Sequence, residues 1–240
     1  MDKDTSQPAT SATFEPLQWH DGDMPYSPKF GDHFYCREDG RAECGHVFLD
    51  GNGLPARWAN AATFLIGELG FGTGLNFCET WRQWKAFADK PDGANLHFVS
   101  FELYPMQGDE IGKALSRWPI LDAERERLVS LWPANPEGEV TLQIASDVTL
   151  TIMCGDALTS ISAERRLFDA WFLDGFAPSR NPAMWSLEIM QALYEHTNDS
   201  GRFATYAAAG FVRRNLQAAG FTVERRPGFA GKREMLCGQK

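Results

Sequence analysis

Apolar residues follow two patterns along the chain, continuous runs and strict alternation. Residues 63–69, 96–101 and 169–173 are almost uninterrupted apolar runs, which are typical of strands buried on both faces of a sheet. Residues 140–144 and 148–153 alternate apolar and polar side chains, which predicts a hairpin. Further strands are predicted at 202–206, 221–226 and 233–237, and helices at 75–84, within 106–132, at 182–195 and at 210–219.

The order of these elements predicts the fold class. Strands that alternate with helices indicate an α/β domain with a mainly parallel, doubly wound sheet, expected over residues 55–240. The last two strands flank a turn at 227–231, which predicts an antiparallel C-terminal hairpin. Aromatic and turn residues over 14–54 predict a small N-terminal β extension of short strands and turns. The polar residues 1–13 are expected to be a flexible leader.

Composition excludes several classes of protein. A hydrophobic content of 43% is ordinary for a globular protein and too high for a disordered one. No stretch reaches the roughly 18 apolar residues of a membrane span, and the N-terminus lacks the apolar run of a signal peptide, so we expect a cytoplasmic protein. The five cysteines are scattered without metal-ligand spacing, and they predict buried thiols and no metal.

Charge is distributed unevenly. The net charge of −9 argues against a polyanionic partner. Residues 201–240, however, contain eight basic and two acidic side chains, a segment charge of +6, which leaves −15 for the rest of the chain. This asymmetry predicts one basic edge that faces a polyanion. A solvated C-terminal face with no partner explains the same residues, and both interpretations stay open.

Glycines and acids gather where the predicted strands end. Ligands of open α/β sheets bind outside the carboxyl ends of the strands. Three alternating glycines after the first buried strand allow a tight turn and a close approach to a ligand. Glu102 ends the second strand and can accept both hydroxyls of a ribose, Asp156 can reach an adenine amino group, and Glu68 can hold an ammonium group directly or through water. The predicted cofactor site contains Glu68, Gly70, Gly72, Gly74, Glu102 and Asp156.

A dinucleotide site also begins with a strand and a glycine-rich turn. Its fingerprint, however, is G-x-G-x-x-G with an acid about 20 residues further on. Here Leu75 takes the place of the third glycine, and Glu102 lies nearer to 30 residues away. A ligand with an amino-acid tail, a ribose and an adenine fits these acids better than a pyrophosphate does.

This set resembles the S-adenosylmethionine methyltransferases of the Rossmann-like class I fold. Longer strings make the chain similar to the methyltransferase domain of the MnmC/MnmD family over nearly its whole length. These strings are ELGFGTGLNF at 68–77, DAWFLDGFAP at 169–178, AGFVRR at 209–214 and KREML at 232–236, with DHFY at 32–35 near the start. The class implies S-adenosyl-L-methionine as the cofactor.

The family resemblance implies a reaction and its partners. Members methylate the aminomethyl nitrogen of 5-aminomethyl-2-thiouridine at the tRNA wobble position, in the anticodon loop, and give the methylaminomethyl form. In many members the domain is fused to an FAD-dependent oxidase that prepares the substrate. The sequence stops at Lys240, so no FAD is expected in this chain, and the oxidase is expected as a separate protein or as the other part of a longer one.

Methyl transfer to an amine needs a neutral nitrogen, and so a proton acceptor beside it. Asp174, at the end of a buried strand, is the candidate; the alternative is a loop-capping Asp. Phe176 and Pro178 are expected to wall a splayed base, although core packing explains Phe176 as well. Phe34 and Tyr35 suit a lid or packing. The tRNA phosphate candidates, taken as a group, are Arg213, Arg214, Arg225, Arg226, Lys232 and Arg233.

Two other functions remain open at this point. A related methyltransferase that acts on another amine or a small molecule needs the same glycines and acids but no basic edge. A module that binds the cofactor only to recruit partners needs no catalytic Asp174.

Overall fold

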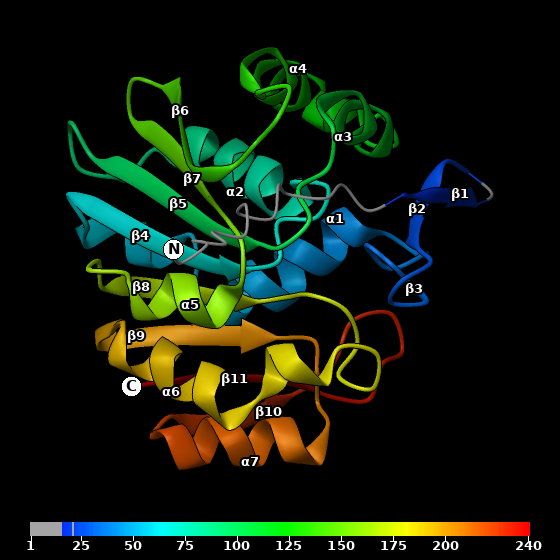
Figure 1. The fold of residues 1–240 in the computed structure, drawn as a ribbon. Coiled ribbons are helices and arrows are strands. Elements are labelled where there is room, and N and C mark those ends of the chain that lie inside the picture. The colour runs from blue at the N-terminus through cyan, green and yellow to red at the C-terminus, as the bar shows by residue number, and fades with distance from the viewer. Residues whose placement is uncertain (1–15, 21) are drawn as a thin grey trace, which may run out of the picture.

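A mixed eight-stranded sheet forms the centre of the computed structural model, which describes residues 16–20 and 22–240 (Figure 1). The strands lie in the order β10-β11-β9-β8-β4-β5-β7-β6. Their bounds are β4 Thr63–Leu69, β5 Asn95–Glu102, β6 Gly138–Ala145, β7 Val148–Cys154, β8 Phe168–Leu173, β9 Thr197–Thr205, β10 Thr222–Arg226 and β11 Met235–Gln239. The expected leader, residues 1–13, lies outside the described residues.

The strand directions confirm the doubly wound prediction. β4 pairs in parallel with both β5 and β8, and these pair in parallel with β7 and β9. The two predicted hairpins are also present: β6 is antiparallel to β7, and β10 is antiparallel to β11. β11 also pairs antiparallel with β9, so it lies between β9 and β10. Because the chain leaves β4 toward one side and returns with β8 on the other, the carboxyl ends of β4 and β8 flank the switch point where ligands bind.

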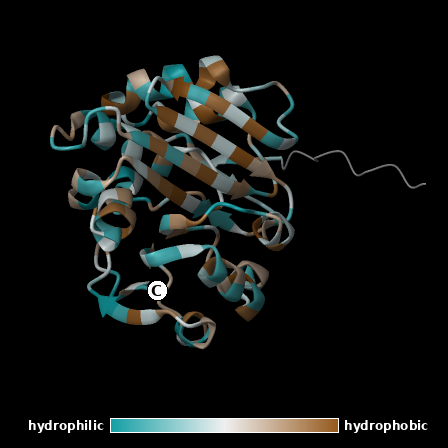
Figure 2. Ribbon diagram, turned by 90° about the vertical axis from the view of Figure 1, so that its left-hand side faces the viewer, coloured by the Kyte–Doolittle hydropathy of each residue, from teal (hydrophilic) through white to brown (hydrophobic). Residues whose placement is uncertain are grey.

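Helices cover both faces of the sheet, and each face has its own hydrophobic core. Phe77 and Trp84 of α2 pack against Phe98 and Phe172 of the sheet on one face. On the other face, Trp171 packs with side chains of α5, α6 and α7. In Figure 2 the hydrophobic residues run along the central strands between these layers. The helices are α2 Leu75–Ala86, α3 Gly108–Leu115, α4 Asp122–Leu131, α5 Ala157–Ser162, α6 Leu187–Glu195 and α7 Gly210–Ala219.

The N-terminal extension is only partly the β structure that we predict. Strands β1 Gln18–His20, β2 Met24–Ser27 and β3 Asp32–His33 form a separate antiparallel sheet. The prediction of strands and turns is wrong from residue 40 on, where α1 (Gly40–Glu43) continues into a π-helix (Cys44–Leu49) and a 3-10 turn (Asp50–Asn52). The helix begins there because the Asp39 carboxylate accepts hydrogen bonds from two backbone N–H groups of its first turn.

The predicted helix at 182–195 is interrupted. Pro182–Trp185 forms a 3-10 turn, and α6 begins only at Leu187. Ser186 between them has an extended backbone (φ −68°, ψ 160°), and its hydroxyl accepts a hydrogen bond from the N–H of Ile189. Ser186 is therefore an N-cap, which competes with a continuous helix.

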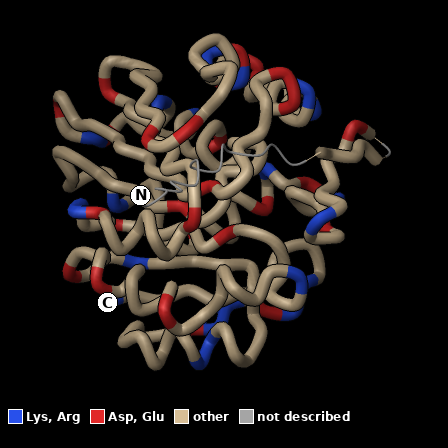
Figure 3. The backbone as a smooth tube through the Cα atoms, in the orientation of Figure 1, with Lys and Arg blue, Asp and Glu red and all other residues tan. Residues whose placement is uncertain are grey.

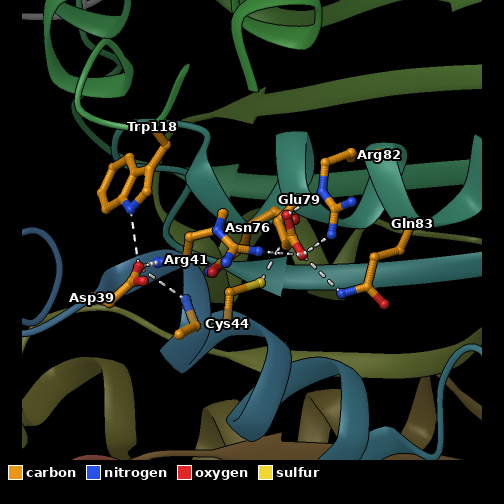
Figure 4. A network of polar contacts seen from close by, with 9 residues as sticks. Asp39, Arg41, Cys44, Asn76, Glu79, Arg82, Gln83 and Trp118 are labelled. Atoms are coloured by element: carbon orange, nitrogen blue, oxygen red, sulfur yellow. Dashed lines mark hydrogen bonds and ion pairs between the residues drawn. The ribbon is translucent and has the colours of Figure 1, made fainter. Parts of the chain in front are cut away.

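A buried polar network fastens α1 to α2 (Figure 4). Glu79 of α2 is 1% exposed and accepts hydrogen bonds from Arg41 of α1 and from Arg82 and Gln83 of its own helix. At the start of α1, Asp39 also accepts a hydrogen bond from the Trp118 ring N–H at 2.9 Å. Because Glu79 is almost fully buried, these hydrogen bonds replace the water that its carboxylate has lost. The hydrogen bond from Arg41 therefore fixes the position of α1. Within the described residues, no helix is long and apolar enough to cross a membrane.

Candidate functional site

A cavity of about 620 Å³ opens at the carboxyl ends of the parallel strands. The segments that follow β4, β5, β7 and β8 supply one part of its lining, and residues 30–48 of the N-terminal extension supply another. The cavity therefore lies at the switch point, and it combines the predicted glycine turn and strand-end acids with a segment that the sequence pattern assigns to an appendage.

The glycine turn after β4 has the backbone that its residues predict. Gly70 (φ +83°), Gly72 (φ +53°) and Gly74 (φ +74°) are all left-handed, a conformation that side chains disfavour. Gly70 and Gly72 line the cavity. Gly74 lies outside the lining, where an added Cβ would stand 2.8 Å from the Phe71 ring. Gly74 allows α2 to begin in close contact with the Phe71 ring. A contact between Gly74 and the cofactor stays a prediction.

Two strand-end acids line the cavity next to this turn. Glu102 accepts hydrogen bonds from the backbone N–H of Gly72 at 3.0 Å and of Tyr104 at 2.8 Å. Asp156 caps α5 by accepting a hydrogen bond from the N–H of Thr159 at 2.9 Å. The backbone thus holds both carboxylates at the cavity, and their roles toward a ribose and an adenine stay predictions.

Glu68 lies beneath the cavity and is fully buried. One of its carboxylate oxygens accepts a hydrogen bond from the Asn76 amide at 2.9 Å, and the other accepts one from the Ser100 hydroxyl at 2.7 Å. Burial raises the pKa of Glu68 well above its ordinary value. Glu68 lies outside the lining, and its Asn76 partner lies in the lining, so a role of Glu68 toward a bound ammonium group stays a prediction.

Asp174 follows β8 and is half-buried at the cavity wall. Its Oδ2 accepts a hydrogen bond from the Asn76 amide at 2.7 Å, and its Oδ1 accepts one from the Gly175 N–H at 2.9 Å. Desolvation, together with the negative charge of Glu43, raises the pKa of Asp174 to about 7. Asp174 therefore caps its own loop and also presents a carboxylate whose affinity for a proton suits acid–base chemistry near neutral pH.

Aromatic rings wall the cavity beside Asp174. Phe176 lines it and stacks on Phe30 with ring centroids 4.5 Å apart, and its edge meets Phe34 at 5.0 Å. Pro178 lies outside the lining. Tyr35 lines the cavity but is mostly buried, and its hydroxyl donates to the Ala114 carbonyl at 3.3 Å, which is a packing role. Phe176 thus lines the cavity and also packs against the N-terminal segment, and its role as a wall for a base stays a prediction.

The predicted phosphate-binding residues are not gathered in one place. Lys232 lines the cavity, whereas Arg213, Arg214 and Arg233 lie outside its lining. Two further candidates pair with acids, Arg225 with Glu234 and Arg226 with Glu224. Figure 3 shows basic segments among α7, β10 and β11 and both signs of charge over the rest. The basic edge is partly neutralised, and tRNA binding there stays a prediction.

Three functional candidates escape the sequence analysis. Asn76 joins Glu68 to Asp174, and Tyr206 donates its hydroxyl to the Gly175 carbonyl at 2.6 Å. Glu43 lines the cavity and pairs with Lys232. Asn76 lies at the start of the helix after the glycines, so its position offered a signal. Glu43 offered none, because its segment is predicted as strand and turn.

Comparison with known proteins gives consistent results. Residues 119–240 match the sequence model of a family described as S-adenosyl-L-methionine-dependent methyltransferase. The bifunctional protein MnmC of Chromohalobacter salexigens, named for tRNA 5-methylaminomethyl-2-thiouridine biosynthesis, is 43% identical over 97% of this chain and 34% of its own length. Its namesake from Caulobacter vibrioides is 41% identical over 92% of this chain and 37% of its own.

Among solved structures, MNMC2 from Aquifex aeolicus superimposes with a TM-score of 0.74 at 20% identity, over 97% of this chain and 72% of that one. This likeness shows a shared fold over nearly the whole chain. The chain spans about a third of the length of the curated relatives that it matches, which is their methyltransferase part.

Proposed function

This chain belongs to the family of S-adenosyl-L-methionine-dependent methyltransferases, and from that premise we propose that it methylates an amine of a modified uridine in tRNA. The acceptor is the aminomethyl nitrogen of 5-aminomethyl-2-thiouridine at the wobble position, and the product is the methylaminomethyl form. The observation that carries the proposal is the position of Asp174, a carboxylate with a raised pKa on the wall of the cavity that begins at the glycine turn.

The cofactor side of the cavity fits S-adenosyl-L-methionine. The left-handed backbone of Gly70 and Gly72 leaves the wall without side chains, and a Cβ on Gly72 would come within 3.1 Å of the Phe34 ring. Glu102 is held by backbone N–H groups beside that turn, where it can accept ribose hydroxyls, and Asp156 can accept from the adenine amino group. When bound, the cofactor supplies an electrophilic methyl group on a sulfonium.

Asp174 prepares the acceptor nitrogen. A primary amine is mostly protonated at pH 7, and only the neutral form has a lone pair for attack. Because its own pKa is raised to about 7, Asp174 can take a proton from the nitrogen at neutral pH and hold the nitrogen by a hydrogen bond. Asn76 and Gly175 fix the carboxylate while this happens.

The RNA side of the proposal rests on the aromatic wall and on the relatives. The curated relatives carry tRNA 5-methylaminomethyl-2-thiouridine biosynthesis in their names, and the methyl group of that product is one that an N-methyltransferase adds. Phe176 offers a ring on which a splayed anticodon base can stack. Arg213, Arg214 and Arg233 contact phosphates of the same tRNA outside the cavity.

A second enzyme must supply the aminomethyl group. The relatives are called bifunctional, and about two thirds of their length lies outside the match. We assign the preceding step to an FAD-dependent oxidase, either fused to this domain or separate from it. Both steps take place in the cytoplasm, where tRNA is used.

The test uses purified protein, radiolabelled S-adenosyl-L-methionine and bulk tRNA from cells that lack this modification, followed by nucleoside analysis. Label in 5-methylaminomethyl-2-thiouridine supports cofactor, substrate and reaction together. If tRNA stays unlabelled while the protein binds the cofactor, the wobble assignment fails, and an acceptor of another class, such as a small amine, takes its place. Salt-sensitive binding of tRNA without methylation would identify a binding module instead.

A further inference from the structure

An ion pair that serves neither the cofactor side nor the core stands at the cavity wall beside Asp174. The Lys232 ammonium donates a hydrogen bond to the Glu43 carboxylate at 2.6 Å. Both residues line the cavity, and both electric charges act on Asp174. The Glu43 side chain is 11% exposed and the Lys232 side chain is 44% exposed, so the acid belongs to the wall and the cation reaches it from the side of the solvent.

Glu43 has a fixed position. It is the last residue of α1, and the network of Figure 4 fastens that helix to α2 through Arg41 and Glu79 and to Trp118 through Asp39. Lys232, in contrast, lies in the connection between β10 and β11, and its neighbours Gly231 and Arg233 are exposed. The carboxylate is thus held by the fold, whereas the ammonium group stands at the end of a long side chain on an exposed turn.

The place that this ammonium occupies is built for a small cation. The Lys232 nitrogen lies 4.8 Å from the centroid of the Tyr206 ring, within the range of a cation–π interaction. The Tyr206 hydroxyl is tied to the Gly175 carbonyl at 2.6 Å, which fixes the ring next to the strand end that carries Asp174. A carboxylate and an aromatic face therefore meet at one position, on the wall of the cavity that Asp174 also lines.

We propose that this position is the binding subsite for the protonated acceptor amine, formed by Glu43 and the Tyr206 ring, and that Lys232 occupies it in the free protein. This inference rests on the proposed function in one respect, that the acceptor is a primary amine. A substrate ammonium group carries the same charge and the same N–H donors as the Lys232 side chain, so it can replace Lys232 without leaving Glu43 unpaired. The amine is then beside Asp174, ready to lose its proton.

Replacement also releases a cation toward the RNA. Lys232 has a long, half-exposed side chain, and a polyanion bound at the cavity mouth offers it phosphate oxygens in place of Glu43. A tRNA that carries the amine meets both demands, because it supplies the ammonium for Glu43 and the phosphate for Lys232. A tRNA with an unmodified wobble base supplies only the second, and Glu43 would lose its cationic partner.

The experiment compares the affinities of two tRNAs that differ only at the wobble base, 5-aminomethyl-2-thiouridine against 2-thiouridine, at pH 7.5 with S-adenosylhomocysteine present. The wild type should prefer the amine-bearing tRNA. Glu43→Gln should lower this preference roughly tenfold, because the charge-assisted contact is lost. Lys232→Met should raise it, because the competing ammonium is gone. Glu124→Gln is the matched control, since Glu124 is 2% exposed, pairs with Lys85 and lies outside the cavity lining. The Glu124→Gln protein should prefer the amine-bearing tRNA as strongly as the wild type does.

Each alternative has its own signature. If Lys232 and Glu43 only hold the loop, or if Lys232 only binds phosphate, each variant changes the affinity for the two tRNAs by the same factor. The preference then stays constant, and the proposal is overturned while methylation by the wild type continues. If the wild type methylates no tRNA, the proposed function fails. The subsite is then tested separately, by titrating the protein with methylammonium chloride. Methylammonium that shifts the NMR signals of Lys232→Ala but not those of the wild type supports the subsite; no shift in either overturns it.

Discussion

The two halves of the cavity hold their acids in different ways. In the cofactor half, which contains Gly70, Gly72, Glu102 and Asp156, the carboxylates accept hydrogen bonds from the N–H groups of the turn after β4 and of residues two or three positions further along their own loops. The acceptor half contains Glu43, Asp174, Phe176, Tyr206 and Lys232. Here Asp174 accepts a hydrogen bond from the Asn76 side chain as well as from the Gly175 N–H, and Glu43 pairs with Lys232, a residue 189 positions away in the sequence.

This difference corresponds to two requirements, binding of the cofactor and recognition of the methyl acceptor. A cofactor that the whole class shares can be held by backbone groups, whose positions follow from the strand–turn–helix geometry whatever the side chains are. The acceptor differs from one methyltransferase to another, so its half is assembled from side chains of α1, of the segments after β8 and β9, and of the connection before β11. Substitutions should therefore separate cofactor binding from methyl transfer.

The strongest separation is expected from Asp174→Asn. The variant should lose methyl transfer by about 10²–10⁴-fold, because the proton acceptor is gone, and it should bind S-adenosylhomocysteine within about twofold of the wild type. Single-turnover transfer and calorimetric titration measure the two properties. Asp169→Asn is a matched control at the other end of β8, where the carboxylate accepts a hydrogen bond from the Leu65 N–H. An Asp174→Asn enzyme with full activity would remove the catalytic assignment.

The reverse separation is expected from Glu102→Ala. It removes the acceptor for the Gly72 N–H and the proposed acceptor for the ribose hydroxyls, and the affinity for S-adenosylhomocysteine should fall about 10–100-fold. At saturating cofactor, transfer should recover most of its rate. The exposed Glu139 on β6 supplies a control, Glu139→Ala, with the affinity of the wild type. An unchanged affinity in Glu102→Ala would mean that the strand-end acid does not contact the cofactor.

A smaller effect is expected from pH. Asp174 must be ionised to accept a proton, and its pKa is raised to about 7, first by desolvation and then by Glu43, so transfer should be lost as the pH falls through that value. The rate with bound substrate should be about tenfold lower at pH 6 than at pH 8. Asp174→Asn should lack this limb in its residual activity. If the rate of the variant still falls at acidic pH, the group that is protonated would be the substrate amine and not Asp174.

The sequence predicts the cofactor half well, because its signals are local. Gly70 and Gly72 follow a buried strand directly, and Glu102 ends the next strand, so periodicity and spacing place them at one end of the sheet. The same reasoning places Asp174 and Phe176 at the cavity. It assigns Glu68 to the ligand although the side chain is fully buried, because a strand residue one position from the turn can point to either face.

The acceptor half is harder to predict because its residues meet only through tertiary structure. Nothing near Glu43 in the sequence indicates that Lys232 will reach it across the C-terminal hairpin. The helix that carries Glu43 is short, and its start depends on a cap by Asp39 within a segment rich in turn residues. Those turn residues are more typical of loops and strands than of a helix, so the sequence pattern does not indicate the segment that closes the site.

The place of β11 in the sheet also sets an order of assembly. The ribosome makes this strand after all its neighbours, yet it pairs with both β9 and β10. While residues 235–239 are still in the exit tunnel, β9 has an open edge in the nascent chain, and an open edge invites pairing with other chains. Insertion of β11 covers this edge of β9 and brings Lys232 against Glu43 in the same event. A partly synthesised chain can thus have a complete glycine turn, but its acceptor half is complete only after β11 has paired with β9 and β10.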